Sequence, residues 1–397
     1  MTKRIMERAD AAMASTYARF PLVIERGEGC TVWDTEGRAY TDFIAGIAVC
    51  GLGHAHPAVA EALCEQARRL CHVSNLYYTI PQIELAEWLV ARCFADRVFF
   101  CNSGAEANEA AIKLARRYFH ERGESGRFRI VAAEKSFHGR TLGALAATGQ
   151  DKIKTGFAPI LEGFDFVPYN DADALRKAVG PETCAVLLEP VQGEGGVVVP
   201  DPDYLARVRE ICDAAGALLI YDEVQTGVGR TGRLFAHEHS GVTPDIMTLA
   251  KALGNGLPIG AMLAREDVAA AFGPGAHATT FGGTPVVTAA ALAVLKTLES
   301  EGIVARCDEI GRYFRERLGT LKERHSIIAQ VRGVGLLVGL ALTVPGAPVV
   351  KAAMEKGYLI NCIQDTVLRF APPLIVDRPG IDGLVEALDG ILKEVAP

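Results

Sequence analysis

Short apolar runs alternate with amphipathic segments through the middle of the chain. Runs rich in apolar and β-branched residues have the length of β-strands, at residues 97–101, 129–133, 185–189, 217–222, 245–249 and 260–264. The segments between them, such as 106–119 and 202–215, repeat apolar residues at i, i+3 and i+4, which predicts helices. This alternation predicts an α/β fold, in which a mostly parallel central sheet has helices on both faces.

The two ends of the chain show other patterns. The segment WDTEGRAYTDF (33–43) predicts a β-hairpin with Glu36 and Gly37 at its turn. Towards the C-terminus, a long helical pattern precedes short strands in LLVGLAL (336–342) and LRFAP (368–372) and then a last helix. We therefore expect three parts: an N-terminal segment (residues 1–52), a large α/β domain (53–290) and a smaller α+β C-terminal domain (291–397).

Composition limits the partners that this chain can have. The net charge of -7 argues against a general nucleic-acid partner, which requires a basic surface. The ten cysteines form no C-x-x-C pair, so we expect reduced core residues of a cytoplasmic protein rather than a zinc or redox motif. Two uncharged stretches, 43–60 and 334–350, contain glycine and proline. We interpret both as buried strands and turns of a soluble protein, not as membrane spans.

Residues capable of chemistry follow the predicted strands. In open parallel sheets, ligands bind beyond the carboxyl ends of the strands. The residues at or just after these ends are Asn102, Ser103, Gly104, Phe137, His138, Arg140, Glu189, Asp222 and Lys251. We therefore expect a carboxylate, a lysine, aromatic rings and a glycine-opened helix at one edge of the sheet.

The segment Asn102-Ser103-Gly104-Ala105 lies where a predicted strand gives way to a helix. The N–H groups of a first helical turn and the helix dipole together form an anion site, and a glycine lets an anion approach the backbone. An ordinary cap explains the same residues equally well, with Ser103 as N-cap and Glu106 completing a capping box. The local sequence does not decide between an anion site and a cap.

Asp222 and Lys251 end or follow strongly apolar runs. A buried carboxylate needs a partner such as a protonated pyridine nitrogen, and the alternative for Asp222 is a salt bridge to Arg230 or Arg233. Desolvation in apolar surroundings lowers the pKa of a lysine and supplies the neutral amine that a Schiff base requires. The alternative for Lys251 is a solvated lysine at the end of a strand.

Three other motifs carry weak signals. Residues 227–232 (GVGRTG) match the dinucleotide-binding pattern, but no clear helix follows them. The pairs His54 with His56 and His237 with His239 have i, i+2 spacing without further zinc-type ligands nearby. Structural or capping roles are favoured for these histidines, and we expect no metal site. No P-loop is present, which excludes ATP chemistry of that type.

Taken as a set, these motifs resemble those of the class III aminotransferases. The segments that carry the resemblance are NSGAEANEAAIKLAR (102–116), FHGRT (137–141), EPVQGEGG (189–196), DEVQTGVGRTG (222–232), LAKALGNGLPIGA (249–261) and TTFGGTP (279–285). They have the order and spacing of that class. The resemblance implies a fold type I enzyme that uses pyridoxal 5′-phosphate (PLP), a homodimer in which the two subunits share their active sites.

The resemblance also implies a role for each cofactor-binding residue. Lys251 would hold PLP covalently, Asp222 would pair with the pyridine nitrogen and Gln225 would contact the ring hydroxyl. Phe137 would stack on the ring. The neighbours Glu223 and Val224 belong to the same cofactor-binding segment. The phosphate would be held by Ser103, Gly104 and Ala105, with Thr280 supplied by the other subunit.

The substrate side can be assigned by the same resemblance. Arg140, assisted by Thr279, would bind a carboxylate at the far end of the pocket. Arg369 would bind the α-carboxylate of glutamate, and Glu189 would pair with Arg369 when an ω-amino substrate is bound, because a movable acid can mask a guanidinium fork. The alternative for Arg369 is an arginine on a surface strand.

Three further segments narrow the resemblance within the class. YARFPL (17–22), DFIAGIAVCGLGHAHP (42–57) and HVSNLYYTIPQIELAEWL (72–89) are similar to members that act on acylated ornithine. The implied reaction is ping-pong transfer of the δ-amino group of N2-acetyl-L-ornithine to 2-oxoglutarate, a step of arginine biosynthesis. Ile47 lies where ornithine δ-aminotransferases place a tyrosine that receives the free α-amino group, which also favours an acylated substrate.

Several other functions remain open. Other amino donors of the class are succinylornithine, succinyldiaminopimelate, ornithine and 4-aminobutyrate. An isomerase on the same fold, glutamate-semialdehyde aminomutase, would need no 2-oxoglutarate. A non-catalytic binding protein on this fold is a further alternative, which the presence of Lys251, Asp222 and the phosphate-binding segment disfavours.

Overall fold

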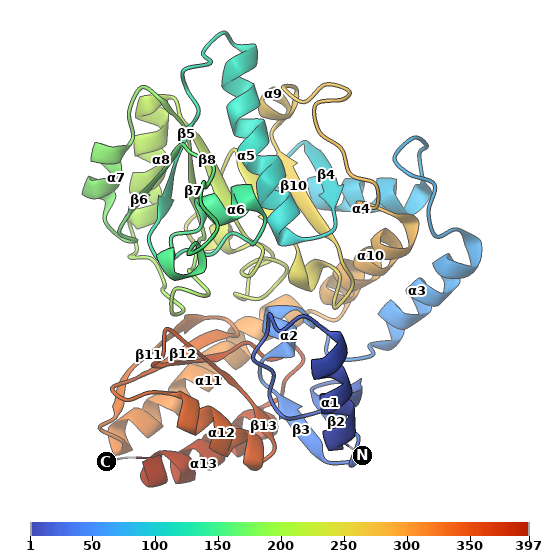
Figure 1. The fold of residues 1–397 in the computed structure, drawn as a ribbon, viewed down its shortest axis with the longest axis vertical. Helices are drawn as coiled ribbons and strands as arrows, with labels where there is room; N and C mark the ends of the chain where they lie inside the picture. The colour runs from blue at the N-terminus through green and yellow to red at the C-terminus, as the bar shows by residue number, and fades with distance from the viewer. Residues whose placement is uncertain (1, 396–397) are drawn as a thin grey trace.

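The computed structural model describes residues 2–395, so residues 1, 396 and 397, at the ends of the first and last predicted parts, lie outside the described residues. A seven-stranded sheet forms the centre of the molecule (Figure 1). Its strands in spatial order are β4 (Arg97–Cys101), β10 (Gly260–Ala264), β9 (Ile246–Leu249), β8 (Leu218–Asp222), β7 (Thr183–Leu188), β5 (Arg129–Ala133) and β6 (Phe164–Val167). Strand β10 runs antiparallel to β4 and β9, and the remaining pairs are parallel. The predicted α/β fold with a mostly parallel sheet is confirmed.

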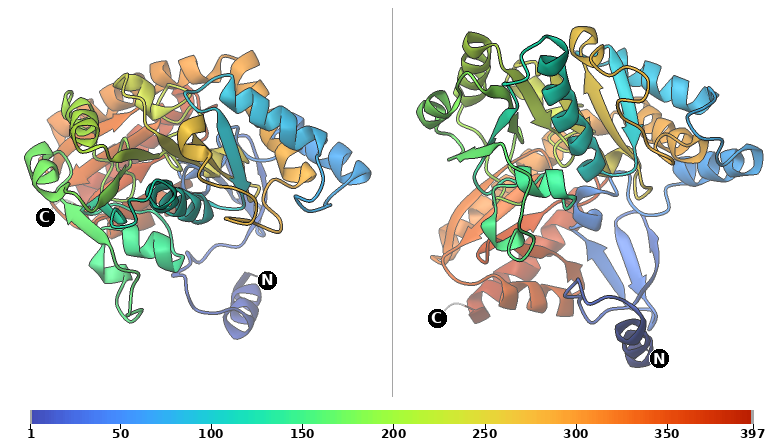
Figure 2. Two further views of the ribbon diagram at one scale, coloured as in Figure 1. Left: turned by 90° about the horizontal axis from the view of Figure 1, so that it is seen from above. Right: turned by 45° about the horizontal axis from the view of Figure 1, so that its top comes forward.

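Alternating residues of the strands face two different layers of helices. In β8, Leu218 and Ile220 pack with α5 (Gly104–Glu121), whereas Leu219 and Tyr221 pack with α7 (Ala172–Ala178) and α8 (Tyr204–Ala215). The views in Figures 1 and 2 show the sheet between these helices. Helices α6 (Leu142–Ala147) and α9 (Glu266–Ala269) contact α5 on its side of the sheet.

Strand β6 is absent from the sequence prediction. Its four residues include Asp165, which forms an ion pair with Arg129 of the neighbouring strand β5 at 2.5 Å. The strand lies at the edge of the sheet and is only partly buried, so it lacks the continuous apolar pattern that marks the inner strands.

The C-terminal part contains an antiparallel sheet with helices packed on it. Its strands in order are β11 (Ile328–Val334), β12 (Leu337–Leu342), β15 (Val367–Phe370) and β14 (Asn361–Ile363). The helices of this part are α11 (Ile303–Arg324), α12 (Ala347–Glu355) and α13 (Arg378–Val395). The predicted strands in 336–342 and 368–372 and the predicted last helix are therefore present.

The N-terminal part is joined to the C-terminal part by a shared sheet. Strands β1 (Ile24–Glu28), β2 (Thr31–Asp34) and β3 (Ala39–Asp42) are antiparallel, and β2 and β3 form the predicted hairpin around Glu36 and Gly37. Strand β13 (Tyr358–Leu359) adds to this sheet parallel to β3. Figure 1 shows both chain ends on this side of the molecule. The division at 52 and 290 remains our proposal, and helix α10 (Pro285–Ser300) crosses the second boundary.

The interpretation of residues 43–60 as strands is wrong. Asp42 accepts hydrogen bonds from the N–H groups of Ile44 and Ala45, and the chain then forms the short helix α2 (Ala45–Ala48), whose residues have positive φ. Helix α3 then begins at Pro57, a residue favoured in a first helical turn. Residues 334–350 do include the buried strand β12, but they also contain the start of α12.

Helices near the N-terminus were not predicted. They are α1 (Thr2–Ala12), α3 (Pro57–Arg69) and α4 (Ile80–Val90), and the last two pack against α10. No helix within residues 2–395 combines the length and the apolar character that crossing a bilayer requires.

Candidate active site

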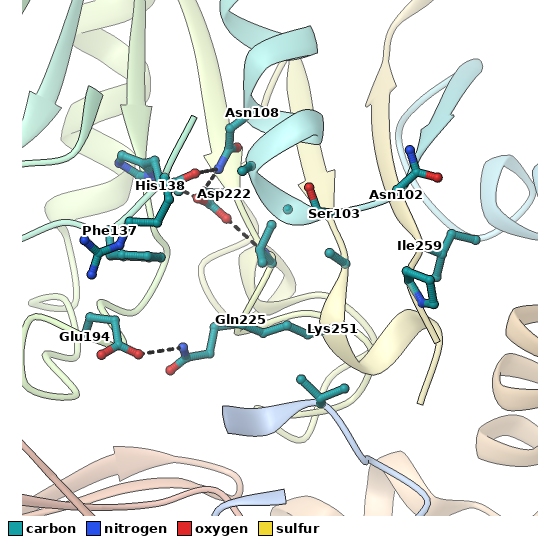
Figure 3. Close-up of a pocket in the computed structure, with 18 of the residues that line it drawn as sticks. Asn102, Ser103, Asn108, Phe137, His138, Glu194, Asp222, Gln225, Lys251 and Ile259 are labelled. Atoms are coloured by element: carbon teal, nitrogen blue, oxygen red, sulfur yellow. Dashed lines mark hydrogen bonds and ion pairs between the residues drawn. The ribbon is translucent and has the colours of Figure 1, made fainter. Parts of the chain in front are cut away.

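A cavity of about 440 Å³ opens at the carboxyl ends of the central strands (Figure 3). This is the edge at which the strand-end rule places a ligand. Among the residues named from the sequence, the structure brings together Ser103, Gly104, Ala105, Phe137, Arg140, Glu189, Asp222, Val224, Gln225 and Lys251 around this cavity. Glu223, Thr279, Thr280 and Arg369 do not line it.

The start of α5 forms one wall of the cavity. Ser103 has an extended backbone and caps the helix, since its hydroxyl accepts a hydrogen bond from the N–H of Glu106 at 3.2 Å. The Glu106 carboxylate returns to the N–H of Asn102. Gly104 is required by packing, because a Cβ atom there would lie 2.6 Å from Cγ1 of Val224. The predicted N-cap role of Ser103 is therefore confirmed, but the capping box is not, because Glu106 bonds to the residue before the N-cap. The first turn of the helix stays open to the cavity.

Asp222 is held by three donors at the end of β8. Its Oδ2 accepts from Nδ2 of Asn108 and from Nδ1 of His138, both at 2.7 Å, and its Oδ1 accepts from the N–H of Val224 at 3.0 Å (Figure 3). The carboxylate is 3% exposed and still lines the cavity. The alternative of a salt bridge from Asp222 to a nearby arginine is wrong.

Arg230 is fully buried elsewhere. Its Nη1 donates to the carbonyl oxygens of Leu336 at 3.2 Å and of Pro372 at 2.5 Å, and thereby links the loop after β8 to the C-terminal part. Burial lowers the pKa of Arg230 to about 10. The guanidinium therefore serves the contact between the two parts of the fold rather than the cavity.

Lys251 begins the short 3-10 helix η3 (Lys251–Leu253), directly after β9. Its φ of 47° lies in the left-handed region, which a lysine adopts only when its surroundings impose it. Burial lowers the pKa of Lys251 below 10.5; Glu194 opposes this shift and Arg369 adds to it. A larger fraction of the amine is therefore neutral and nucleophilic than in a solvated lysine.

The structure pairs Arg369 with Glu194, and not with Glu189 as predicted. Arg369, on β15, is 2% exposed and its Nη1 forms an ion pair with Oε1 of Glu194 and a hydrogen bond with Oε1 of Gln225 at 3.3 Å. Glu189 instead accepts hydrogen bonds from the backbone N–H groups of Phe137 at 3.2 Å and Gly193 at 3.1 Å. The alternative of a surface arginine is also wrong, because Arg369 is buried.

Glu223 does not reach the cavity, which corrects its assignment to the cofactor. Its carboxylate is buried on the other side of the strand end, where it accepts from the N–H groups of Ala236 at 2.5 Å and His237 at 2.9 Å. Nδ1 of His237 also contacts it at 2.9 Å. Consecutive residues of an extended chain point in opposite directions, so Asp222 and Glu223 cannot both face one cavity.

Thr279 and Thr280 lie beside the cavity in their own chain. Oγ1 of Thr279 accepts a hydrogen bond from Nδ2 of Asn102, a residue that lines the cavity, at 3.3 Å. Thr280 lies in a separate small hollow with His72 and Ser74. The contribution of Thr280 to a second subunit and the assistance of Thr279 to Arg140 stay predictions.

The other weak motifs have structural roles. His54 bonds to Asp42 at 2.8 Å, and His239 contacts the carbonyl oxygen of Thr231 at 3.0 Å. The loop 227–232 is followed by the short 3-10 helix η2 (Ala236–His239) rather than by a long helix. In residues 2–395, no three His, Cys, Asp or Glu side chains are grouped so as to hold a metal ion.

The sequence does not predict the roles of three residues of the site. Glu194 shares its motif with Glu189, so the motif alone does not distinguish the two acids. His138 lies at a strand end, but the sequence indicates no role for it. Asn108 is a buried polar residue on the apolar face of α5, and that break in the apolar pattern could have identified it.

Residues 12–392 match the family Aminotransferase class-III. The chain is a class III aminotransferase. This class III aminotransferase is 53% identical over 384 residues to the acetylornithine aminotransferase of Caldanaerobacter subterraneus subsp. tengcongensis, which covers 96% of this chain and 98% of the relative. The acetylornithine aminotransferase of Methanocaldococcus jannaschii is 52% identical over 384 residues, with 96% of this chain and 95% of the relative covered.

Solved structures agree with this assignment. The ornithine aminotransferase of Toxoplasma gondii ME49 has a TM-score of 0.96 at 34% identity, covering 100% of this chain and 96% of that chain. The acetylornithine aminotransferase of Elizabethkingia anophelis has a TM-score of 0.89 at 33% identity, covering 99% of each chain. The resemblance drawn from the sequence motifs is therefore confirmed.

Class III aminotransferases use PLP, and an ornithine aminotransferase of T. gondii similar to this chain holds PLP at partial occupancy in its active site. The cavity residues of this class III aminotransferase fit that cofactor. The lowered pKa of Lys251 supplies a neutral amine, Asp222 supplies a buried carboxylate for a pyridine nitrogen, and the N-terminus of α5 supplies an anion site for a phosphate.

Replacement of Glu189 by glutamine is expected to change how the stability of the cofactor-free protein depends on pH. Burial raises the pKa of Glu189 from 4.5 to about 7; the nearby His138 opposes this shift and Asp222 adds to it. Between these two pH values, the folded protein keeps a proton that the unfolded chain has lost. The free energy of unfolding therefore falls as the pH rises, by about 3 kcal/mol once the pH exceeds the folded-state pKa.

Urea unfolding of the apoprotein across this pH range measures the effect. In Glu189→Gln the decline should be absent, so the variant should be the more stable protein above neutral pH. Glu182→Gln, at an exposed glutamate, serves as the control and should behave like wild type. Parallel pH profiles for wild type and Glu189→Gln would contradict the prediction.

Proposed function

We propose that this enzyme is an N-acetylornithine aminotransferase. It transfers the δ-amino group of N2-acetyl-L-ornithine to 2-oxoglutarate and forms N-acetylglutamate semialdehyde and glutamate, a step of arginine biosynthesis. The observation that carries the proposal is a buried arginine, Arg369, masked by Glu194 beside the lysine of the cavity. Curated relatives that are 50–54% identical over nearly the whole chain are acetylornithine aminotransferases, which supports the same substrate.

Different residues of the cavity would bind different parts of PLP. Lys251 would hold the cofactor through its Nζ and Asp222 would pair with the ring nitrogen, while Gln225 hydrogen-bonds with Glu194 and Arg369. Ser103 and the backbone N–H groups of Gly104 and Ala105 would bind the phosphate, and Phe137 would pack on the ring. When bound, PLP acts as an electron sink that stabilises negative charge on the carbon next to the amine.

Lys251 also moves protons. Its Nζ, when free, would remove a proton from the substrate carbon that carries the nitrogen, which requires the amine to be neutral. The lowered pKa of Lys251 increases the fraction of the amine in that form. One residue thus serves as covalent holder and as general acid and base.

Two arginines account for the two substrates. Arg140 is exposed and lines the cavity, and its guanidinium lies 5.6 Å from the ring centroid of Phe137. It binds the single carboxylate of N-acetylornithine while Arg369 stays paired with Glu194. Glutamate has two carboxylates, so Glu194 must release Arg369, which then binds the α-carboxylate through its planar fork.

Ornithine is the second candidate donor, since the ornithine aminotransferase of T. gondii has a TM-score of 0.96 with this chain. Ile47 disfavours it. This side chain is 45% exposed, two residues before Val49, which lines the cavity, and it offers no hydrogen-bonding group to a free α-amino group. An acylated α-nitrogen needs no such group.

The homodimer with shared sites also belongs to this proposal. Large apolar side chains are exposed on one segment and near Thr280, namely Leu76, Tyr77, Tyr78, Ile80 and Phe281. A groove of about 670 Å³ adjoins them between α3, α4 and α10. A second copy of the chain would cover this surface and bring Thr280 to the neighbouring cavity. The ten free cysteines fit a reducing, cytoplasmic location.

A single-turnover spectral titration of the PLP-loaded enzyme tests the substrate. N-acetylornithine, N-succinylornithine, ornithine and 4-aminobutyrate are compared for conversion of the cofactor to its amine form. N-acetylornithine should have the highest rate constant per unit concentration. If it is the poorest of the four, the proposed substrate is wrong, and turnover of glutamate semialdehyde without 2-oxoglutarate would indicate the isomerase instead.

A further inference from the structure

Asn108 is a buried amide on α5, one helical turn beyond the phosphate-binding residues. It is 1% exposed. Its Nδ2 donates to Oδ2 of Asp222 and to the carbonyl oxygen of His138, both at 2.7 Å, and its Oδ1 accepts from Oγ1 of Thr248 at 2.8 Å. Figure 3 shows Asn108 pointing from the helix towards Asp222 and His138. An asparagine side chain has two N–H donors and one carbonyl, so every group is used.

Thr248 completes the hydrogen bonds of this amide. Its hydroxyl is fully buried on β9, directly opposite Asp222 in the register of the two strands. If the amide were turned over, Oδ1 would face the carboxylate oxygen of Asp222 and the carbonyl oxygen of His138, so that three acceptors would meet without a proton. These two acceptors therefore keep the donating side of Asn108 towards Asp222, and the threonine hydroxyl satisfies the carbonyl side by donating to Oδ1.

The consequence for Asp222 is a fixed position. Charge-assisted hydrogen bonds to a carboxylate are stronger and more directional than neutral ones. Oδ2 receives two of these bonds, which leaves Oδ1, bonded to the N–H of Val224, as the oxygen with room for another partner.

Asn108 also joins two ends of the cavity. The helix that presents Ser103, Gly104 and Ala105 carries Asn108 four residues after Gly104, a rise of about 6 Å along the axis. One rigid helix therefore sets the position of the anion site and, through the amide, the position of the carboxylate.

We infer that Asn108, with its carbonyl held by Thr248, is a positioning residue that aims the Asp222 carboxylate at the ring nitrogen of PLP. The inference rests on the proposed function, because it assumes that the cavity holds this cofactor. Asn108 acts through Asp222.

The test measures PLP binding by the apoprotein rather than turnover. Asn108→Leu keeps the volume but removes the donors, and we expect PLP affinity to fall about 10- to 100-fold, the range for a lost hydrogen bond to a charged group. Asn108→Asp places a second carboxylate against Asp222 and should weaken binding further. In both variants the visible absorption band of bound PLP should shift.

Thr248 supplies a matched pair of variants. Thr248→Val removes the hydroxyl at constant shape and should weaken PLP binding, whereas Thr248→Ser keeps the hydroxyl and should restore affinity and spectrum. Thr288→Val is the control, because Thr288 is equally buried but its hydroxyl bonds only to backbone carbonyls of its own helix, α10. It should bind PLP like wild type. Thermal melting of each apoprotein reports on folding.

The outcomes separate the inference from the proposed function. If wild type gives no visible band with PLP, the proposed function fails. If wild type binds PLP and a folded Asn108→Leu matches it in affinity and spectrum, the inference is wrong. If Asn108→Leu does not fold, the threonine pair decides, and equal affinity and spectrum for Thr248→Val and Thr248→Ser would overturn the role of this amide.

Discussion

Replacement of Lys251 by alanine is expected to abolish turnover and to remove the covalent link between protein and PLP. Lys251 lines the cavity at the end of β9, next to the strand whose end carries Asp222. We propose two tasks for its amine, as covalent holder and as the base at the substrate carbon. Proton transfer by a positioned group alone contributes about 10²- to 10⁴-fold to a rate, so the combined loss should exceed about 10³-fold.

Steady-state transamination and the visible spectrum of the PLP-loaded protein measure this effect. Lys251→Arg should be equally inactive, since a guanidinium stays protonated and cannot act as a nucleophile. Lys322→Ala, at an exposed lysine of α11, is the matched control and should keep wild-type turnover. Turnover near the wild-type rate in Lys251→Ala would refute the assigned role.

The apolar runs predicted the inner strands because those strands are buried on both faces. In β7 and β8 every residue is buried, so each reads as a continuous apolar run with a polar residue where it meets the cavity. The rule that ligands bind at strand ends then located Ser103, Asp222 and Lys251 without knowledge of any contact. This part of the site follows from local sequence and from the topology of parallel sheets.

Other features depend on the path of the chain between distant residues. The pairing of β3 with β13 joins residues more than 300 positions apart, and no local pattern marks it. Likewise, EPVQGEGG contains two acids, and only the turn after β7 decides that Glu194 reaches Arg369 on β15 while Glu189 bonds to nearby backbone. By contrast, the sequence does predict that only one of Asp222 and Glu223 faces the cavity, since adjacent residues of a strand face opposite sides.

Replacement of Arg369 by alanine is expected to separate the two half-reactions of the enzyme. Burial raises the pKa of Glu194, but the charge and hydrogen bond of Arg369, together with Lys251 and Gln225, outweigh burial, so the net shift of the pKa is downward. In the glutamate half-reaction the α-carboxylate would take the place of Glu194 on Arg369. Removal of the guanidinium should therefore lower kcat/KM for glutamate by about 10²-fold or more, the range for a charged partner left unpaired in a buried site.

The kcat/KM for N-acetylornithine should fall much less, because Arg369 would stay paired with Glu194 in that half-reaction and would not contact the substrate. Stopped-flow measurement of each half-reaction provides the comparison. The variant Arg369→Lys tests whether bidentate binding of the carboxylate matters, since lysine keeps the charge but loses the planar pair of donors. Glu194→Gln should act in the opposite sense, because it leaves Arg369 unmasked and so should favour binding of glutamate over N-acetylornithine. Equal losses in both half-reactions of Arg369→Ala would mean that the arginine holds the fold of the cavity and does not choose between the two substrates.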